Sequence, residues 1–403
     1  MKRILVLLVA LVAVMAFASF AVAAKSVVAI VKASPEEAKA MDGGFHINDD
    51  TAHEQTSKYH NETGEYVRAL WSPESEEVWY QQMKKAIDMV GGIPLKKGET
   101  VLIKPNHVLS YYPMNWMGFG DDNSIQGAFS DPRASLAAAR ICAEMGAGRI
   151  IIAECPALGD AWATYMNYGY TWPATVKKYA DMGVKYELID LCEDWEMMKG
   201  LGLASPEYPM PKLLKQVQCL VNISCFKTHE YAGVTFALKN LGIGLPSQRV
   251  IGACKFGLPH RNVAEVHVDV NYIAQKLVPR QIHICDALYA GTWVPVAPYF
   301  LSGLLFASKD PVALDAIATA VMNMNPRNIG TTRLAAQYKL GQMEYDQIEV
   351  VGTPLEEAII QDFPRHPYKG RKWPWTPTMY GKVSNWDQFY RHEIYGVPNY
   401  PRW

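Results

Sequence analysis

Short apolar, β-branched runs alternate with longer segments of helical hydrophobic period along most of the chain. Buried strands are predicted at residues 27–31, 100–105, 149–154, 185–190, 218–224, 281–286, 303–308 and 348–351. Helices are predicted at about 74–89, 131–145, 174–182, 263–276 and 311–322. Strand–helix–strand alternation of this kind predicts an α/β fold, with a mainly parallel sheet that carries helices on both faces.

The first 24 residues have a different pattern. Lys2 and Arg3 precede an apolar run over residues 4–20, and small residues follow up to Ala24. This order is typical of a secretory signal peptide, and we expect cleavage after Ala23 or Ala24. The mature protein is then exported, periplasmic or secreted, and has no transmembrane segment. The alternative is an uncleaved membrane anchor.

The C-terminal residues 353–403 form a second distinct segment, rich in proline and aromatic residues and without a sustained helical or strand period. We interpret this segment as an appendage to an α/β domain over residues 25–352. It is either an extended strap that buries its rings, or a lid, a partner site or a subunit-exchange arm. The last two alternatives imply a homo-oligomer or a redox partner bound through the tail.

Charge and composition narrow the class of protein. The chain has 39 Lys and Arg against 40 Asp and Glu, so it lacks the basic excess of proteins that bind nucleic-acid backbone. Hydrophobic residues make up 49% and charged residues 20%, which is ordinary globular composition and excludes a disordered or fibrous chain.

The seven cysteines lie between Cys142 and Cys285 and contain no C-x-x-C pair. This spacing argues against a small disulfide scaffold and against a cysteine-ligated zinc or iron–sulfur site. Cys155, Cys225 and Cys285 each lie at the end of an apolar run. Their sulfurs converge if the three strands are neighbours; the alternative is that they pack as small buried apolar residues.

Ligands of parallel α/β sheets bind outside the carboxyl ends of the strands, and several polar residues lie there in this sequence. A lysine at a strand end needs an anionic partner when it is buried, which is either a bound anion or a carboxylate of the protein itself. The predicted anion-binding residues are Lys104, Asn106, Lys227, Lys239 and Asn240, and the predicted catalytic residues are His229, Glu154 and Asp286. Lys239 and Asn240 precede what reads as a glycine-rich turn at Gly242 and Gly244.

The blocks IKPN, SDP, IIIAE, VNISCFKTH, TFALKNLGIGL, HICDAL and ASKDPVALDA occur in this order. Together they resemble the domain-of-unknown-function-362 family of bacterial and archaeal proteins, over roughly Val27 to Gly352. The resemblance marks Lys104, Asn106, Asp131, Glu154, Lys227, His229, Lys239, Asn240, Asp286, Asp310 and Asp315 as recurring polar positions. Some relatives carry a ferredoxin-like cysteine cluster, but this chain has no C-x-x-C-x-x-C run, which argues against an iron–sulfur cofactor.

Two further features carry candidate chemistry. His46, His53 and His60 are spaced by seven among acidic residues, and imidazole with carboxylate suits a divalent metal. Neighbouring glycines favour the alternative, a solvated loop. Aromatic residues also follow two strand ends, where they form either the walls of a ligand pocket or loops packed on themselves. These are Tyr111, Tyr112, Trp116, Trp162, Tyr165 and Tyr168.

The sequence therefore favours an exported α/β enzyme that acts on a small anionic substrate by proton transfer or metal-assisted chemistry. Lys227 and Lys239 would hold the anion, and His229 is the acid–base candidate because its unperturbed pKa lies near neutrality. The alternatives are a non-catalytic periplasmic protein for ligand binding, metal binding or maturation, and an accessory subunit of an exported redox complex.

Overall fold

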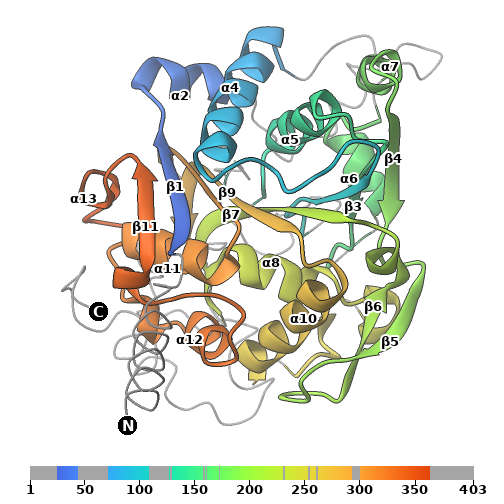
Figure 1. The fold of residues 1–403 in the computed structure, drawn as a ribbon, viewed down its shortest axis with the longest axis vertical. Helices are drawn as coiled ribbons and strands as arrows, with labels where there is room; N and C mark the ends of the chain where they lie inside the picture. Colours follow the sequence, from blue (N-terminus) through green and yellow to red (C-terminus); the bar gives the residue numbers. More distant parts are fainter. Residues whose placement is uncertain are drawn as a thin grey trace, which may run out of the picture.

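A computed structural model of the chain (Figure 1) describes most of its central part. The described residues are 25–43, 71–108, 127, 129–157, 159, 161–171, 173–229, 232–252, 255–259, 262–292 and 300–363. The predicted signal peptide, the three spaced histidines, the aromatic residues 111, 112 and 116, and most of the C-terminal tail lie outside these residues.

The central element is a nine-stranded sheet with the order β11-β1-β10-β9-β7-β2-β3-β4, in which β8 pairs with β7 alone. The strands are β1 (Ser26–Lys32), β2 (Thr100–Lys104), β3 (Arg149–Glu154), β4 (Lys185–Asp190), β7 (Cys219–His229), β8 (Gly233–Thr235), β9 (Gln281–Thr292), β10 (Phe300–Ser308) and β11 (Ile348–Gly352). Strands β9, β7, β2, β3 and β4 are parallel neighbours, whereas β10 runs antiparallel to β1 and β9. The predicted mainly parallel sheet is confirmed.

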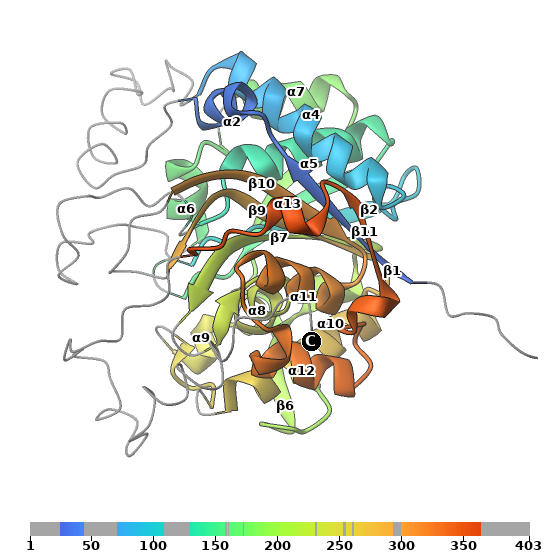
Figure 2. The same cartoon turned by 90° about the vertical axis from the view of Figure 1, so that its left-hand side faces the viewer.

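Helices cover both faces of this sheet, as Figure 2 shows. One face carries α2 (Pro35–Asp42), α4 (Pro73–Met89), α5 (Pro132–Glu144) and α7 (Pro173–Asp181), with α6 (Ala161–Asn167) near β4. The other face carries α8 (Ala237–Gly244), α10 (Val263–Leu277), α11 (Pro311–Val321) and α12 (Gly330–Gln337). Shorter helical turns are α9 (Gln248–Ile251), α13 (Leu355–Ala358), η2 (Lys212–Lys215), η5 (Pro326–Asn328) and η6 (Tyr345–Gln347).

The apolar runs of the strands are continuous because each strand is buried on both faces. In β2, Val101 and Ile103 join the core on the side of α4 and α5, whereas Leu102 joins the core on the opposite side. Each of these side chains is fully buried. The same alternation decides toward which face a polar residue at a strand end points.

Two sequence interpretations need correction. The segment between β4 and β7, for which no strand was predicted, contains an antiparallel hairpin of β5 (Trp195–Lys199) and β6 (Glu207–Pro211). Gly242 and Gly244 lie within α8 rather than in a turn. They allow close packing: a Cβ at Gly242 would lie 2.6 Å from His267 Cδ2, and one at Gly244 would lie 2.8 Å from Lys104 Nζ.

Three of the recurring acidic residues cap helices. Asp131 is the N-cap of α5, and Asp310 is the N-cap of α11. Asp315 lies inside α11, and its carboxylate accepts hydrogen bonds from the backbone N–H groups of Ala237 and Leu238, at 2.9 and 3.3 Å. Asp315 therefore holds the first turn of α8, the helix that carries Lys239 and Asn240.

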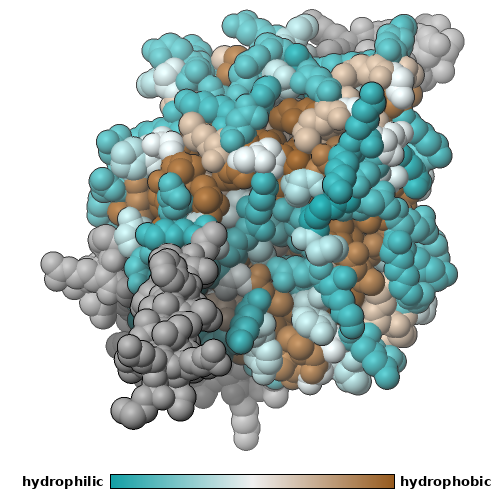
Figure 3. All heavy atoms as spheres, in the orientation of Figure 1, coloured by the Kyte–Doolittle hydropathy of each residue, from teal (hydrophilic) through white to brown (hydrophobic). Residues whose placement is uncertain are grey.

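In the described part of the chain, no helix combines the length and the apolar character that crossing a membrane requires. Hydrophilic side chains surround smaller apolar areas on the face of the molecule shown in Figure 3.

Candidate functional site

A pocket opens at the carboxyl ends of β2 and β3, where α8 packs against the sheet. Its cavity volume is about 40 Å³. That is room for about three water molecules or one small polyatomic anion. Its polar lining consists of Lys104, Asn106, His107, Glu154, Lys239, Asn240 and Lys255.

Lys104 and Glu154 form an ion pair in this lining, and their side chains are 1% and 2% exposed. The Lys104 ammonium also donates to Pro105 O at 2.9 Å. The Glu154 carboxylate accepts the backbone N–H groups of His107 and Cys155, at 2.8 and 2.9 Å. Burial lowers the pKa of Lys104, and the charge of Glu154 opposes that shift.

A chain of buried amides fixes the next part of the lining. Asn106 Nδ2 donates to Asn240 Oδ1 at 2.9 Å, and Asn240 Nδ2 donates to Asn222 Oδ1 at 2.7 Å. Asn240 Nδ2 also donates to Ile223 O at 3.0 Å. This network connects the turn after β2, α8 and β7. The amides therefore hold α8 at a fixed position over the strand ends.

His107 follows Asn106 directly and also lines the pocket. Its ring stacks on Tyr168 with centroids 4.5 Å apart, and its Nε2 lies 2.9 Å from Tyr170 Oη. Burial lowers the pKa of His107 to about 3, so the imidazole is neutral at pH 7. Within the described part of the chain, the buried His107 Nδ1 and Asn106 Oδ1 have no hydrogen-bond partner. Such atoms are available to a polar ligand.

Lys255 supplies another ammonium to the lining, and its side chain is buried. Its Nζ donates to Ile243 O at 2.6 Å. Burial, followed by the charge of Lys104, lowers the pKa of Lys255 to about 7. The pocket thus gathers three lysines, since the half-buried Lys239 also lines it, against the single carboxylate of Glu154.

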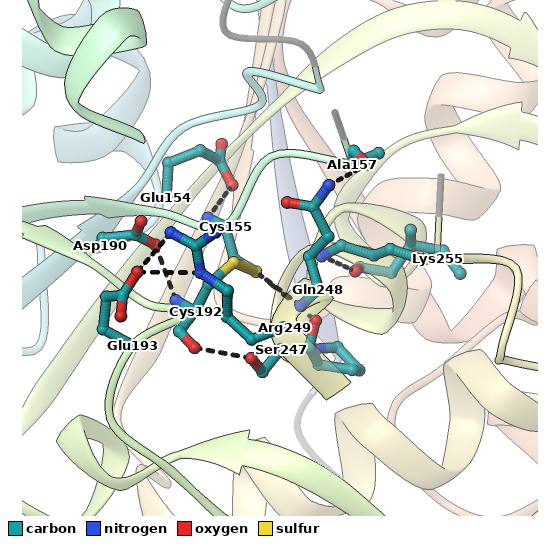
Figure 4. The surroundings of a disulfide bond; sticks show 12 residues. Glu154, Cys155, Ala157, Asp190, Cys192, Glu193, Ser247, Gln248, Arg249 and Lys255 are labelled. Atoms are coloured by element: carbon teal, nitrogen blue, oxygen red, sulfur yellow. Dashed lines mark hydrogen bonds and ion pairs between the residues drawn. A yellow bond between two sulfur atoms is a disulfide. The ribbon is translucent and has the colours of Figure 1, made fainter. Parts of the chain in front are cut away.

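A disulfide between Cys155 and Cys192 lies beside the pocket (Figure 4). The two cysteines are 37 residues apart, and the bond joins the chain after β3 to the chain after β4. Cys155 also lines the pocket. The suggested convergence of Cys155, Cys225 and Cys285 is therefore wrong: Cys155 is bonded to Cys192, and the other two remain buried free thiols on the neighbouring strands β7 and β9.

Lys227 and His229 do not line this pocket. Lys227 is fully buried, and its Nζ lies 5.9 Å from the ring centroid of Phe129, on the side of the sheet that α5 covers. Lys104 points to the other side, against α8. Burial lowers the pKa of Lys227 to about 8. His229 is the last residue of β7 and is half-buried. The predicted binding and catalytic roles of Lys227 and His229 stay predictions.

Asp286 also lies away from the pocket lining, in β9. Its carboxylate accepts the backbone N–H of Asp131 at 2.7 Å and that of Leu288 at 3.1 Å. Burial, with a smaller contribution from the charge of Asp131, raises the pKa of Asp286 to about 7. Asp131 in turn is paired with the fully buried Arg133. Asp286 therefore belongs to a network that anchors the start of α5.

His107 and Lys255 are site residues that sequence reasoning did not select. His107 directly follows the IKPN block, so its position at a strand end could have identified it as a candidate site residue. Lys255 lies in GACKFG, between Gly252 and Gly257, where no strand or helix pattern gives it a position. Its place in the pocket depends on the packing of α8 and could not be read from local sequence.

The aromatic residues take separate positions. Tyr165 and Tyr168 are buried, and Tyr165 Oη accepts the backbone N–H of Glu154 at 2.8 Å. Trp162 is 52% exposed. Tyr165 and Tyr168 contact the lining residues Glu154 and His107, whereas Trp162 faces solvent. Among the residues that the structure describes, no group of three or more His, Cys, Asp and Glu side chains could hold a metal ion.

The sequence profile of a family described as "Domain of unknown function (DUF362)" matches residues 101–320, more than half of the chain. The matched part contains Lys104, Asn106, Glu154, Lys239 and Lys255. No curated protein matches the chain.

The chain is weakly similar to several solved structures, among them the following two. A protein from Thermotoga maritima has a TM-score of 0.36 and 11% identity, and the match covers 65% of this chain and 59% of that one. The lactate racemase apoprotein from Thermoanaerobacterium thermosaccharolyticum has a TM-score of 0.31 and 14% identity, over 58% of this chain and 52% of that one. The chain thus spans between half and two thirds of the length of these structures.

Proposed function

The chain belongs to the family described as Domain of unknown function (DUF362), and we propose that it is an exported α/β enzyme acting on a small anionic substrate. One observation carries the proposal: among the residues that the structure describes, Lys104, Lys239 and Lys255 line one pocket together with one carboxylate, that of Glu154. Burying cations together is costly unless an anion joins them, so a bound anion fits this lining.

The residues divide into binding and reacting groups. Lys239 is half-buried and lies at the pocket, so it would meet an entering anion. Asn106 Oδ1 and His107 Nδ1 have no hydrogen-bond partner among the described residues. The amide oxygen can accept from an O–H or N–H group of a substrate, and His107 Nδ1 can donate to it in the tautomer that carries the proton there. Lys255, with a pKa of about 7, exchanges a proton at neutral pH more readily than an ordinary lysine. It takes in this proposal the place that the sequence suggested for His229.

The cavity volume sets the size of the substrate. About 40 Å³ accommodates an anion of a few heavy atoms, such as a two- or three-carbon carboxylate.

Export is part of the same proposal. A disulfide such as Cys155–Cys192 persists in oxidising compartments and is rare in the cytosol. The bond supports the interpretation of residues 1–24 as a signal peptide. N-terminal sequencing of the protein from its own host tests this: the proposal requires a chain that begins at Ala24 or Lys25, and a retained Met1 would contradict it.

The enzymatic part is tested by deuterium exchange. Small carboxylates, including pyruvate, lactate and glycolate, are incubated with the protein in deuterated water, and exchange of their C–H protons is followed by NMR. The expected result is exchange in the wild type and in Lys84→Met, an exposed lysine paired with Asp88. Lys255→Met should lose it by about 10²-fold or more.

Native mass spectrometry of the protein purified from its host complements this measurement. A co-purifying small acid with no turnover of any carboxylate would favour the alternative, a periplasmic binding or maturation protein. If the protein showed neither a co-purifying anion nor deuterium exchange, that result would contradict the proposed function.

A further inference from the structure

We propose that Lys255 is a nucleophile that forms an imine with the carbonyl group of a small 2-oxo acid bound in the pocket. This inference rests on the proposed function, because it assigns a substrate class and a covalent step to the same pocket.

The position of Lys255 carries the argument. Its side chain is 1% exposed and yet lines the cavity, so its amine meets the contents of the pocket rather than bulk solvent. Within the described part of the chain, the amine donates one hydrogen bond, from Nζ to Ile243 O at 2.6 Å. An amine held in this way can direct its remaining valences toward a ligand in the cavity.

The backbone conformation of Lys255 also indicates that the surrounding structure determines the position of this residue. Its φ is +56°, in the left-handed region that non-glycine residues rarely adopt. Such conformations persist where the surrounding structure enforces them, and they cluster at active sites. The surrounding structure therefore holds the backbone of Lys255 in this conformation at some conformational cost.

The surroundings also make the amine reactive. Only a neutral amine has the lone pair that attacks a carbonyl carbon, and lysines are made nucleophilic by desolvation or by a neighbouring cation. Lys255 has both: it is buried, and the charge of Lys104 adds to the effect of burial. With a pKa of about 7, a large fraction is neutral at neutral pH.

The remaining lining indicates the substrate class. Lys239 provides positive charge for a carboxylate in the same small cavity, beside the Lys104–Glu154 ion pair. Lys239 and Lys255 line the same small cavity, so a short substrate that meets Lys239 with its carboxylate would present its next carbon to Lys255. The carbonyl is therefore placed next to the carboxylate, which describes a 2-oxo acid of two or three carbons.

The step balances without an external oxidant or reductant. The Lys255 lone pair forms a C–N bond as the carbonyl π bond breaks, and the proton lost from nitrogen passes to the former carbonyl oxygen. The resulting carbinolamine takes up one proton and loses water as its C–O bond breaks, which leaves a protonated imine.

The test is reduction of the imine in place. The full-length protein is incubated with pyruvate and sodium borohydride, digested and mapped by mass spectrometry. We expect one dominant adduct, on the peptide that contains Lys255, with the added mass of pyruvic acid less one oxygen atom. Acetate, which cannot form an imine, should give none. Lys84→Met should keep the adduct and Lys255→Met should lose it.

The wild-type peptide map identifies the site directly, so the test does not depend on whether Lys255→Met folds. Adducts spread over exposed lysines, or no adduct on Lys255, overturn the inference. Binding of pyruvate measured by calorimetry separates the two proposals. Pyruvate binding without a Lys255 adduct removes the imine and leaves the anion pocket. If pyruvate neither binds nor forms an adduct, both the imine at Lys255 and the binding of small 2-oxo acids in the pocket are contradicted.

Discussion

The Lys104 ammonium and the Glu154 carboxylate form an ion pair at the carboxyl ends of the adjacent parallel strands β2 and β3. Both side chains are almost completely buried. This pair and the hydrogen-bonded amides of Asn106 and Asn240 belong to the lining of the candidate site. The pair is a neutral unit, so the positive charge offered to an anion comes chiefly from Lys239, and from Lys255 where it is protonated.

The first prediction concerns this ion pair. Lys104→Met or Glu154→Gln alone should lower the free energy of unfolding by about 3–5 kcal/mol, because each substitution leaves the other buried charged side chain without its partner. The double variant should lose much less than the sum of the two. Urea unfolding of the four proteins measures the coupling. Loss of the exposed Lys177–Asp181 pair should cost less than about 1 kcal/mol. Strictly additive effects at Lys104 and Glu154 would contradict the prediction.

The second prediction concerns Gly244. A Cβ at this position would lie 2.8 Å from Lys104 Nζ and 2.9 Å from its Cε, so Gly244→Ala should displace the lysine. We expect a loss of about 1–3 kcal/mol in the free energy of unfolding and weaker anion binding. The matched control is Gly330→Ala, whose new Cβ would have an ordinary 3.5 Å contact with Ala264. Equal behaviour of the two variants in unfolding and calorimetry would rule out the close contact as a constraint.

The third prediction is a pH dependence caused by Lys255. Its pKa is about 7 in the folded protein and about 10.4 in an unfolded chain. Between these values the unfolded chain binds more protons, so this group makes stability rise with pH, by at most about 1.4 kcal/mol per unit. Below pH 7 both states are protonated and the contribution is constant.

Unfolding of the wild type and of Lys255→Met across this pH range measures that contribution. The difference between the two stability curves should change above pH 7 in favour of the wild type, whereas Lys84→Met should follow the wild type throughout. A constant difference would mean that Lys255 titrates as an ordinary lysine.

The fourth prediction concerns the Cys155–Cys192 disulfide. Cys192→Ala should lower the free energy of unfolding by about 2–4 kcal/mol, because the cross-link restricts the unfolded chain. Reductant should destabilise the wild type and leave this variant unchanged. Cys219→Ala, which removes a buried free thiol instead, should keep its sensitivity to reductant. Insensitivity of the wild type to reductant, with both thiols found alkylated, would contradict the bond.

Much of the fold could be predicted because the apolar runs and helix-start signals are local. Ser72 and Pro73 are such signals at the start of α4, and Asp131 and Pro132 are such signals at the start of α5. The β5–β6 hairpin was not predicted, since its strands contain Pro209 and have no clear alternation. The glycines of α8 were read as a turn because the sequence does not show that Lys104 and His267 approach them closely.

The site was only partly predictable. The strand-end rule brings together Lys104, Asn106 and Glu154, since β2 and β3 are neighbours. The rule says nothing about which face of the sheet a side chain takes, and Lys227 points toward Phe129 rather than toward α8. Asp286 illustrates a second limit: a carboxylate at a strand end can serve a backbone N–H group as well as a ligand.

The central claim is that the pocket binds a small anion through its lysines, and calorimetric titration with pyruvate and with inorganic phosphate tests it most directly. The wild type and Lys84→Met should bind one of these anions with equal affinity, and Lys239→Met should bind it at least about tenfold more weakly, which corresponds to about 1.4 kcal/mol. Affinity should fall with added salt, because the attraction is electrostatic. Binding that is equal in all three proteins, or absent for both anions, would contradict the account.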